Sequence, residues 1–482
     1  MSHKIFRNSF SALLAGIMLI ASGCATNPVT GKREVMLVSE SQEQAMGDQA
    51  DPQIIASMGL YEDQQLQNFI QRKGEAMGKI SHRSDLDYKF RIVDSPVINA
   101  FAVPGGYVYF TRGIMAHFNN EAQFAGVLGH EIGHITARHS AAQQSKATLG
   151  QGLLLAGAIA SNTVAGSLQG LSQGMQLLFL KYGRDDESQS DELGVEYSTK
   201  IGYNAEEMAY FFSTLERNQA QSGQSIPEFL SSHPSPARRQ QTVLKLAEQW
   251  EKKVGDQSLE VGRNSYLKMI DGMVYGEDPK QGFVENNMFY HPELKFQFPV
   301  PQTWQYQNTP QAVQMAPRDG GALVTFTLAQ GNSAEAAAQQ MVEQYKMQVV
   351  ESKRTSVNGM EAVAVMADVQ QEQGTIRTLT YFIEYGSNIY SIMGIAPNTT
   401  FNNYASIFSN VATNFNKLTD SEKINRKPER IRIKTLSRNM TLSQALQSFG
   451  MPNDRLEELA ILNGMLLTDQ LSSGVMIKTV SR

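Results

Sequence analysis

Two histidines and a glutamate stand at a spacing that could bind a metal ion and do chemistry with it. His130 and His134 are four residues apart, and Glu131 directly follows the first of them. On a helix, side chains four residues apart lie on one face, so both imidazoles can reach one ion. Glu131 would lie beside them, placed to take a proton from water activated by zinc. The alternative is a helix with two incidental buried histidines, which would be costly without partners.

A catalytic zinc needs a third protein ligand, and acidic residues further along the chain could supply it. Glu187 and Asp191 are also four residues apart, in a helical pattern that begins at Asp186. One carboxylate could bind the metal while the other accepts the free N–H of a ligand histidine and fixes its tautomer. Acidic residues on helices usually face water, so this pair alone is a weak signal. We expect Glu187 as the ligand, in preference to Asp186 or Glu192.

The elements predicted around these residues form a mainly helical region with a small β edge. Asn120 and Gln123 resemble a capping box at the start of the helix that carries the histidines. Other helical patterns cover residues 41–80 and 186–253, and strand patterns cover residues 89–93 and 100–112. Residues 153–180 are rich in Gly, Ala and Leu. They are expected to form two packed core helices or, alternatively, a mobile lid or a surface that touches the membrane.

The start of the chain has the pattern of a bacterial export signal. Lys4 and Arg7 precede a short apolar run at residues 10–20, which is followed by Ala-Ser-Gly-Cys ending at Cys24. This ending resembles a lipobox, in which the cysteine becomes the lipidated first residue of the mature protein. The alternative is an ordinary signal peptide with an incidental cysteine. The resemblance implies a signal peptide at 1–23, a lipid-anchored tether at 24–40 and an outer-membrane anchor facing the periplasm.

Length and composition predict several domains. The chain has 482 residues and a net charge of −5, so it has no basic excess that would indicate nucleic acid. We expect the helical domain at 41–270. After it the pattern becomes α+β at 271–419, with helical patterns at 334–349 and 403–416. We expect an accessory domain there without a catalytic cluster, followed by a charged linker at 420–430. Residues 431–482 form a last small unit in strand–helix–helix–strand order.

Several segments together resemble the secreted or lipoprotein branch of the zinc metallopeptidases related to the CAAX prenyl protease and HtpX. They are Asn-Ala-Phe-Ala-Val-Pro-Gly-Gly at 99–106, Leu-Gly-His-Glu-Ile-Gly-His at 128–134, Arg184 with Glu187 and Asp191, and His233-Pro234 with Arg239. The resemblance spans about residues 26–246 and implies a zincin-like fold with one zinc ion per chain. It implies the following roles: His130, His134 and Glu187 as metal ligands, Glu131 as base, and Asp191 as the partner of a ligand histidine.

The resemblance also implies roles beside the metal. A peptide could add as an extra strand to the edge strand that contains Asn99, Ala100, Phe101 and Ala102; the alternative is a buried hairpin. His233 could occupy the open metal position and hold the enzyme inactive, and Arg239 could steady a substrate carbonyl or this loop. The alternative for His233 is a surface loop that precedes a helix starting at Pro236. The spacing of His139 does not suit a fourth ligand.

Residues 431–482 resemble a LysM module, although Arg438-Asn439-Met440 stands where the usual Gly-Asp precedes Thr441-Leu442. This resemblance implies attachment to peptidoglycan, and the alternative is a packing or substrate-docking domain. The expected function is a zinc-dependent endopeptidase that acts on misfolded or misassembled envelope proteins. One alternative is a chaperone-like or peptidoglycan-associated binding protein whose zinc site His233 keeps latent. Another is a hydrolase of peptidoglycan peptides.

Overall fold

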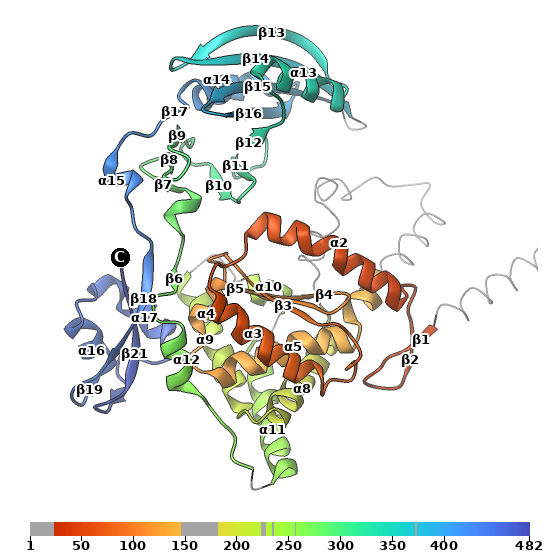
Figure 1. Ribbon diagram of the computed structural model, residues 1–482, viewed down its shortest axis with the longest axis vertical. Coiled ribbons are helices and arrows are strands. Elements are labelled where there is room, and N and C mark those ends of the chain that lie inside the picture. Colours follow the sequence, from red (N-terminus) through yellow and green to blue (C-terminus); the bar gives the residue numbers. More distant parts are fainter. Residues whose placement is uncertain (1–23, 146–181, 223–227, 234–235, 256, 372–373) are drawn as a thin grey trace, which may run out of the picture. The chain divides into compact units, whose positions relative to one another are not determined.

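The structure, a computed structural model, describes residues 24–145, 182–222, 228–233, 236–255, 257–371 and 374–482 (Figure 1). These residues form two compact units. The first unit contains the chain up to Gly276 together with Arg430–Ser481, and the second unit contains Glu277–Glu429. The Gly-, Ala- and Leu-rich stretch at 153–180 lies outside the described residues. Among the residues that are described, no helix combines the length and the apolar character that crossing a membrane requires.

The first unit is mainly helical up to its link with the second. Its helices are α2 (Glu40–Met58), α3 (Gln64–Gly78), α4 (Arg112–His117), α5 (Glu121–Thr136), α8 (Arg184–Lys200), α9 (Glu206–Ser222), α10 (Glu228–Ser232), α11 (Pro236–Val254) and α12 (Arg263–Met269). A small sheet has the order β3 (Lys89–Val93), β5 (Tyr107–Thr111), β4 (Ala100–Val103), with β3 parallel and β4 antiparallel to β5. The prediction of a helical region with a small β edge is therefore confirmed.

Helix α5 is the central helix of the first unit. Every residue from Ala122 to Thr136 is buried, as expected for a helix that is apolar on most of its surface. Asn120 caps its start by accepting a hydrogen bond from the backbone N–H of Gln123, as the sequence predicts. The glutamine side chain in turn accepts from the backbone N–H of Asn119. The helix that carries the two histidines is thus fixed at its start and buried along its length.

Helices α5 and α8 approach each other closely because glycines line their contact. A Cβ atom added at Gly129 would lie 2.9 Å from the carbonyl oxygen of Gly194, and one added at Gly194 would lie 3.1 Å from the backbone nitrogen of His130. Gly133 similarly lies against Leu193 and Ser190 of α8. This close packing brings the side chains of α8 within reach of the histidines of α5.

Residues 24–38 form an ordered hairpin beside the end of α5. Strands β1 (Cys24–Thr26) and β2 (Arg33–Val35) pair antiparallel, with Cys24 opposite Val35. The side chain of Asn27 accepts hydrogen bonds from two backbone N–H groups of the turn and donates to the carbonyl of Ala137 at 3.3 Å. The segment predicted as a tether therefore contacts the first unit directly.

The C-terminal residues belong to the first unit. They contain β18 (Glu429–Thr435), β19 (Met440–Thr441), α16 (Leu442–Ser448), α17 (Leu456–Leu462), β20 (Gln470–Leu471) and β21 (Met476–Ser481), which include the predicted strand–helix–helix–strand order. Strand β18 lies between β21 and β6 (Val274–Tyr275) in one sheet. Buried Lys478 donates to the carbonyls of Ala116 and Phe118 at the end of α4. Arg217 of α9 donates to the carbonyl of Met465 at 2.8 Å.

The second unit is built on a seven-stranded antiparallel sheet in the order β10-β11-β12-β16-β15-β14-β13. Its strands are β10 (Gln305–Asn308), β11 (Ala312–Ala316), β12 (Leu323–Ala329), β13 (Gln348–Val357), β14 (Met360–Gln371), β15 (Gly374–Tyr385) and β16 (Asn388–Pro397). A four-stranded sheet has the order β17 (Asn416–Lys417), β9 (Phe296–Pro299), β8 (Met288–His291), β7 (Phe283–Glu285). Helices α13 (Ala334–Gln344) and α14 (Phe401–Thr413) pack on the larger sheet.

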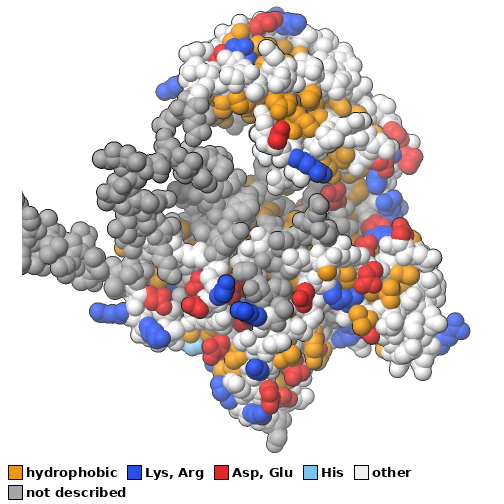
Figure 2. All heavy atoms as spheres, turned by 180° about the vertical axis from the view of Figure 1, so that it is seen from behind, with side chains coloured by type: hydrophobic (Ala, Val, Ile, Leu, Met, Phe, Trp, Pro, Cys, Tyr) orange, Lys and Arg blue, Asp and Glu red, His pale blue; other side chains and the backbone are white. Residues whose placement is uncertain are grey.

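The α+β character predicted for this part of the chain is confirmed, but one helix was predicted too long. The helical pattern at residues 334–349 was expected to form a single helix, whereas α13 ends at Gln344 and the chain enters β13 four residues later. The face of the molecule shown in Figure 2 carries hydrophobic side chains on the second unit, at the top, and mixed acidic and basic side chains on the first.

Candidate metal centre

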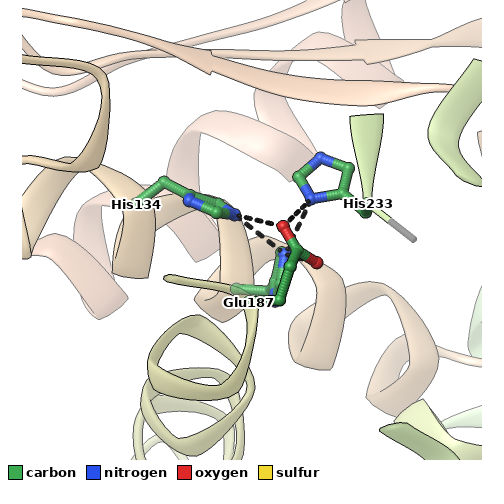
Figure 3. A group of neighbouring side chains, drawn as sticks. His134, Glu187 and His233 are labelled. Carbon is green, nitrogen blue, oxygen red and sulfur yellow. Dashed lines mark hydrogen bonds and ion pairs between the residues drawn. The ribbon is translucent and has the colours of Figure 1, made fainter. Parts of the chain in front are cut away.

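Four buried side chains of the first unit converge on one point. They are His130 and His134 of α5, Glu187 of α8 and His233 just after α10, and their ligand atoms all lie within 4.8 Å of one another. Nε2 of His130 lies 3.0 Å from Nε2 of His134 and 3.2 Å from Nδ1 of His233. The same nitrogen of His233 lies 2.8 Å from a carboxylate oxygen of Glu187. Figure 3 shows His134 and His233 pointing at Glu187.

The chemistry of this donor set fits a zinc ion. Nδ1 of His130 lies 3.0 Å from the Asp191 carboxylate, so that nitrogen carries the proton and Nε2 presents a lone pair to the centre. Burial and the nearby Arg239 lower the pKa of His130 to about 4, which keeps the ring neutral at pH 7. Ligand atoms bonded to one tetrahedral zinc stand roughly 3.4 Å apart. The spacing of the nitrogens and the carboxylate therefore suits the ion.

Glu131 lies in this centre without the partners that a buried carboxylate needs. It is fully buried, and both of its carboxylate oxygens lack a hydrogen-bond partner within the described part of the chain. Nε2 of His233 is 3.7 Å from one of them. Burial raises the pKa of Glu131 to about 7, although the positive charge of His233 opposes the shift. A carboxylate with this pKa can take up and release a proton at neutral pH, which is what a general base requires.

Asp191 and Arg239 form a bidentate ion pair behind the metal-facing atoms. The guanidinium donates through Nε and Nη2 to the two Asp191 oxygens at 2.9 and 2.7 Å. Its Nη1 lies 2.9 Å from Glu187 and 3.3 Å from the carbonyl oxygen of His233. Burial alone would raise the pKa of Asp191, but Arg239 lowers it to about 2. Of the two roles expected for Arg239, these contacts favour holding the loop.

His233 fills the corner of the centre that a catalytic zinc site would keep open. Its ring stacks on Phe229, with centroids 4.6 Å apart, and its backbone N–H donates to the Phe229 carbonyl at 2.8 Å. Burial would lower the pKa of His233, but the carboxylates of Glu187 and Glu131 raise it. The side chain is 1% exposed, so it is part of the interior of this unit and not a surface loop histidine.

The expected substrate strand lies beside the centre but is buried. Ala100, Phe101 and Ala102 belong to β4, at one edge of its three-stranded sheet, and β4 packs against α5. Asn99 precedes the strand, and its backbone exchanges hydrogen bonds with Thr111. All four residues are at most 6% exposed. The strand thus lies at the edge of its sheet, and its role in binding a substrate stays a prediction.

Two side chains near His134 were not predicted. The ring of Tyr182 stacks on the imidazole of His134 with centroids 3.8 Å apart, and its hydroxyl lies 2.9 Å from Ser140. Nδ1 of His139 lies 3.0 Å from Nδ1 of His134. Tyr182 stands far from the histidines in the chain and carried no signal in the sequence. The position of His139 depends on a turn after α5 that its helical spacing does not indicate.

Comparisons with known proteins match this part of the chain. Residues 64–247 match the sequence profile of Peptidase family M48. The Beta-barrel assembly-enhancing protease of Escherichia coli (strain K12) is 28% identical over 259 residues, which cover 50% of this chain and 52% of that protein. The protein of the same name from Yersinia pestis is 31% identical over 221 residues, covering 44% and 45%.

A mitochondrial relative matches over a shorter range. Mitochondrial metalloendopeptidase OMA1 of Arabidopsis thaliana is 28% identical over 182 residues, 37% of this chain and 36% of that protein. The chain thus spans about half the length, or less, of these three relatives. Among solved structures, cyanobacterial PsbP from Synechocystis covers 27% of this chain with a TM-score of 0.24 and 10% identity, a likeness too distant to indicate a shared fold. Residues 64–247, which contain the four converging side chains, are therefore similar in sequence to Peptidase family M48.

Proposed function

We propose that this chain is a zinc-dependent endopeptidase of the bacterial cell envelope. The observation that carries the proposal is the convergence of His130, His134 and Glu187 beside Glu131, whose carboxylate has no hydrogen-bond partner among the residues that the structure describes. The match of residues 64–247 to Peptidase family M48 supports it. The relatives named Beta-barrel assembly-enhancing protease support misfolded or misassembled envelope proteins as its substrates, in a role in protein quality control.

Each residue of the site would have its own role in peptide hydrolysis. His130, His134 and Glu187 would hold the zinc ion. When bound, zinc supplies Lewis acidity, which makes a water molecule more acidic and polarises a peptide carbonyl. Glu131 takes a proton from the attacking water on its carboxylate and then gives it to the leaving amine. Its pKa of about 7 suits both steps at neutral pH. Asp191 orients His130, and Arg239 holds Asp191 in place.

We further propose that His233 keeps the resting site latent. A catalytic zinc site keeps one position open, whereas a site with four protein ligands is typical of a structural zinc. Nδ1 of His233 lies among the other ligand atoms, and its Nε2 faces Glu131. In this position His233 excludes water from both the metal and the base. Replacing it with alanine is therefore expected to raise the basal activity.

Cleavage of an unfolded protein tests the proposal. Purified protein, loaded with zinc, is incubated with casein, and peptide release is compared among the wild type, Glu131→Gln and His233→Ala, with and without a zinc chelator. We expect cleavage that is strongest in His233→Ala and abolished by the chelator and by Glu131→Gln. The proposal would be wrong if no zinc-loaded form, including His233→Ala, cleaved casein.

Two alternative functions predict other outcomes in the same set of proteins. A chaperone-like binding protein with a permanently latent site would prevent aggregation of an unfolded client equally well as wild type and as Glu131→Gln, without cleavage. A peptidoglycan-peptide hydrolase would release cross-linked muropeptides from purified sacculi. The matched relatives are named as proteases, which supports cleavage of proteins over both alternatives.

For the two ends of the chain we propose an anchor and a packing module. Lipidation of Cys24 would place the hairpin β1–β2, and with it the first unit, close to the outer membrane. Incorporation of a labelled fatty acid that Cys24→Ala abolishes would test this.

Of the two roles expected for residues 431–482, we favour packing over peptidoglycan binding. In this module Lys478 donates a hydrogen bond to a carbonyl of α4, and the carbonyl of Met465 accepts one from Arg217 of α9. Binding of the protein to purified peptidoglycan would contradict this choice.

A further inference from the structure

The two histidines of α5 contact different partners through their Nδ1 atoms. Nδ1 of His130 meets a carboxylate, that of Asp191, at 3.0 Å. Nδ1 of His134 instead meets the neutral ring of another histidine, His139, also at 3.0 Å. His139 is 3% exposed, and a carboxylate oxygen of Asp186 lies 3.8 Å from its Nε2.

Only one assignment of protons satisfies these contacts when His134 binds a metal through Nε2. Its Nδ1 must then carry the proton, which it donates to Nδ1 of His139. His139 accepts at that atom, so its own proton lies on Nε2. That nitrogen is 2.9 Å from the side-chain carbonyl oxygen of Gln189, which is an acceptor. The hydrogen bonds therefore run in one direction only: His134 donates to His139, and His139 donates to Gln189.

A fixed turn brings His139 back toward His134. Helix α5 ends at Thr136, and the backbone passes through Arg138 with φ of 60°, a left-handed conformation that is uncommon outside glycine. The guanidinium of Arg138 donates to Glu43 at 3.1 Å and to the carbonyl of Val38 at 2.8 Å. A new helical segment begins at His139. The strained turn is thus held by buried contacts of the Arg138 side chain.

Glu43, which anchors this turn, has a second buried partner. Arg83 donates to its other carboxylate oxygen at 3.0 Å and to the carbonyl of Ile135, in the last turn of α5, at 3.3 Å. Glu43, Arg83 and Arg138 are each at most 5% exposed. These bonds join the last turn of α5 and the turn after it to α2, although Nη2 of Arg83 has no hydrogen-bond partner among the described residues. The network therefore fixes the direction in which His139 leaves the helix.

We propose that His139 is a positioning residue that sets the tautomer and ring orientation of His134 and so strengthens metal binding. The inference rests on the proposed function, because it requires that His134 binds zinc. It explains how Nδ1 of His134 is satisfied by a ring nitrogen, at an atom that meets no carboxylate within the described part of the chain. Tyr182, stacked on the other side of the ring, limits its rotation further.

Two substitutions at one position separate hydrogen bonding from packing. His139→Phe keeps a planar ring but removes the acceptor, whereas His139→Asn places an amide oxygen near the former Nδ1. Loss of such a partner typically weakens metal binding about 10- to 100-fold. We expect that loss in His139→Phe, and an affinity within a few fold of wild type in His139→Asn. Zinc affinity is measured by competition with a chromophoric chelator, and the absorption spectrum of bound Co²⁺ reports the ligand geometry.

A second pair of substitutions covers the case in which His139→Phe does not fold. Gln189 is only partly buried, so Gln189→Leu should fold, and it removes the acceptor for Nε2 of His139. We expect weaker zinc binding in Gln189→Leu and near wild-type binding in Gln189→Glu, which keeps the acceptor. Thermal unfolding of the metal-free proteins checks that each variant is folded.

The outcomes distinguish this inference from the proposed function. If the wild type does not bind zinc, the proposed function fails. If the wild type binds zinc and the phenylalanine variant binds it equally well with an unchanged Co²⁺ spectrum, the positioning role of His139 is overturned. Equal losses in the Phe and Asn variants would also overturn it, because the acceptor atom would then not be the cause.

Discussion

Replacing Glu131 with glutamine should abolish cleavage and at the same time stabilise the metal-free protein. Glu131 is fully buried, and neither of its oxygens has a hydrogen-bond partner among the described residues. Burial raises its pKa from the usual 4.5 to about 7. Between these values the unfolded chain has released the proton while the folded protein still holds it. Stability is therefore lost as the pH rises from about 4.5 to 7 and stays reduced above that.

The size of the effect follows from the shift. Each pKa unit corresponds to about 1.4 kcal/mol, so the ionised carboxylate lowers the free energy of unfolding by about 3 kcal/mol at pH 8 and by almost nothing at pH 4.5. Glutamine has nearly the same shape and no charge to bury. Glu131→Gln should therefore gain about 3 kcal/mol over the wild type at pH 8, and this gain should vanish toward pH 4.5.

Urea unfolding of the two metal-free proteins at pH 5 and pH 8 measures this difference. Glu192→Gln is the matched control, because it replaces an exposed carboxylate on α8 and should give the same difference from wild type at both pH values. A Glu131→Gln protein that was no more stable than the wild type at pH 8 would refute the argument that burial without partners destabilises this carboxylate.

Two further substitutions test the packing that positions the site. Gly129→Ala should weaken zinc binding by at least tenfold and lower thermal stability, because its Cβ would lie 2.9 Å from the carbonyl of Gly194 and would push α5 from α8; chelator competition and thermal unfolding measure both. Burial lowers the pKa of Lys478 well below its usual value, so the unfolded chain binds the proton more readily and stability due to this group rises with pH. Relative to wild type, Lys478→Met should therefore lose stability from pH 7 to pH 9, by at most about 1.4 kcal/mol per pH unit, in urea unfolding.

The parts of the site that share a helix could be predicted from the sequence alone. His130, Glu131 and His134 lie within five residues, and Glu187 and Asp191 within another five, so helical periodicity determines which face each occupies. The structure brings both segments together, and the glycines that allow this approach are local features as well. What periodicity cannot supply is the contact between the two helices, which came from the resemblance to a family.

Features that depend on long-range packing or on a special turn were not predicted. His139 continues the helical numbering of α5, but Arg138 adopts a left-handed conformation that its bonds to Glu43 and Val38, about 100 residues away, stabilise. The start of strand β13 was not predicted, because residues 345–349 extend a helical pattern whereas pairing with β14 requires an extended chain. Packing was one of the two roles expected for residues 431–482, but its contacts could not be predicted, since Lys478 has the sequence character of a surface lysine and its partners are main-chain carbonyls.

His233 lies close both to the candidate metal ligands and to Glu131. In the latent state proposed above, its Nδ1 would occupy the position that substrate and water need, and its Nε2 lies 3.7 Å from Glu131, the proposed base, whose oxygens have no hydrogen-bond partner within the described residues. One movement of this ring would therefore open the metal position and admit water to Glu131 together. The contacts of its backbone with Phe229 and Arg239 do not involve the ring nitrogens, so they could persist while the imidazole leaves. On this reasoning activation requires a change of the His233 side chain and its stacking on Phe229, not a rearrangement of the three ligands.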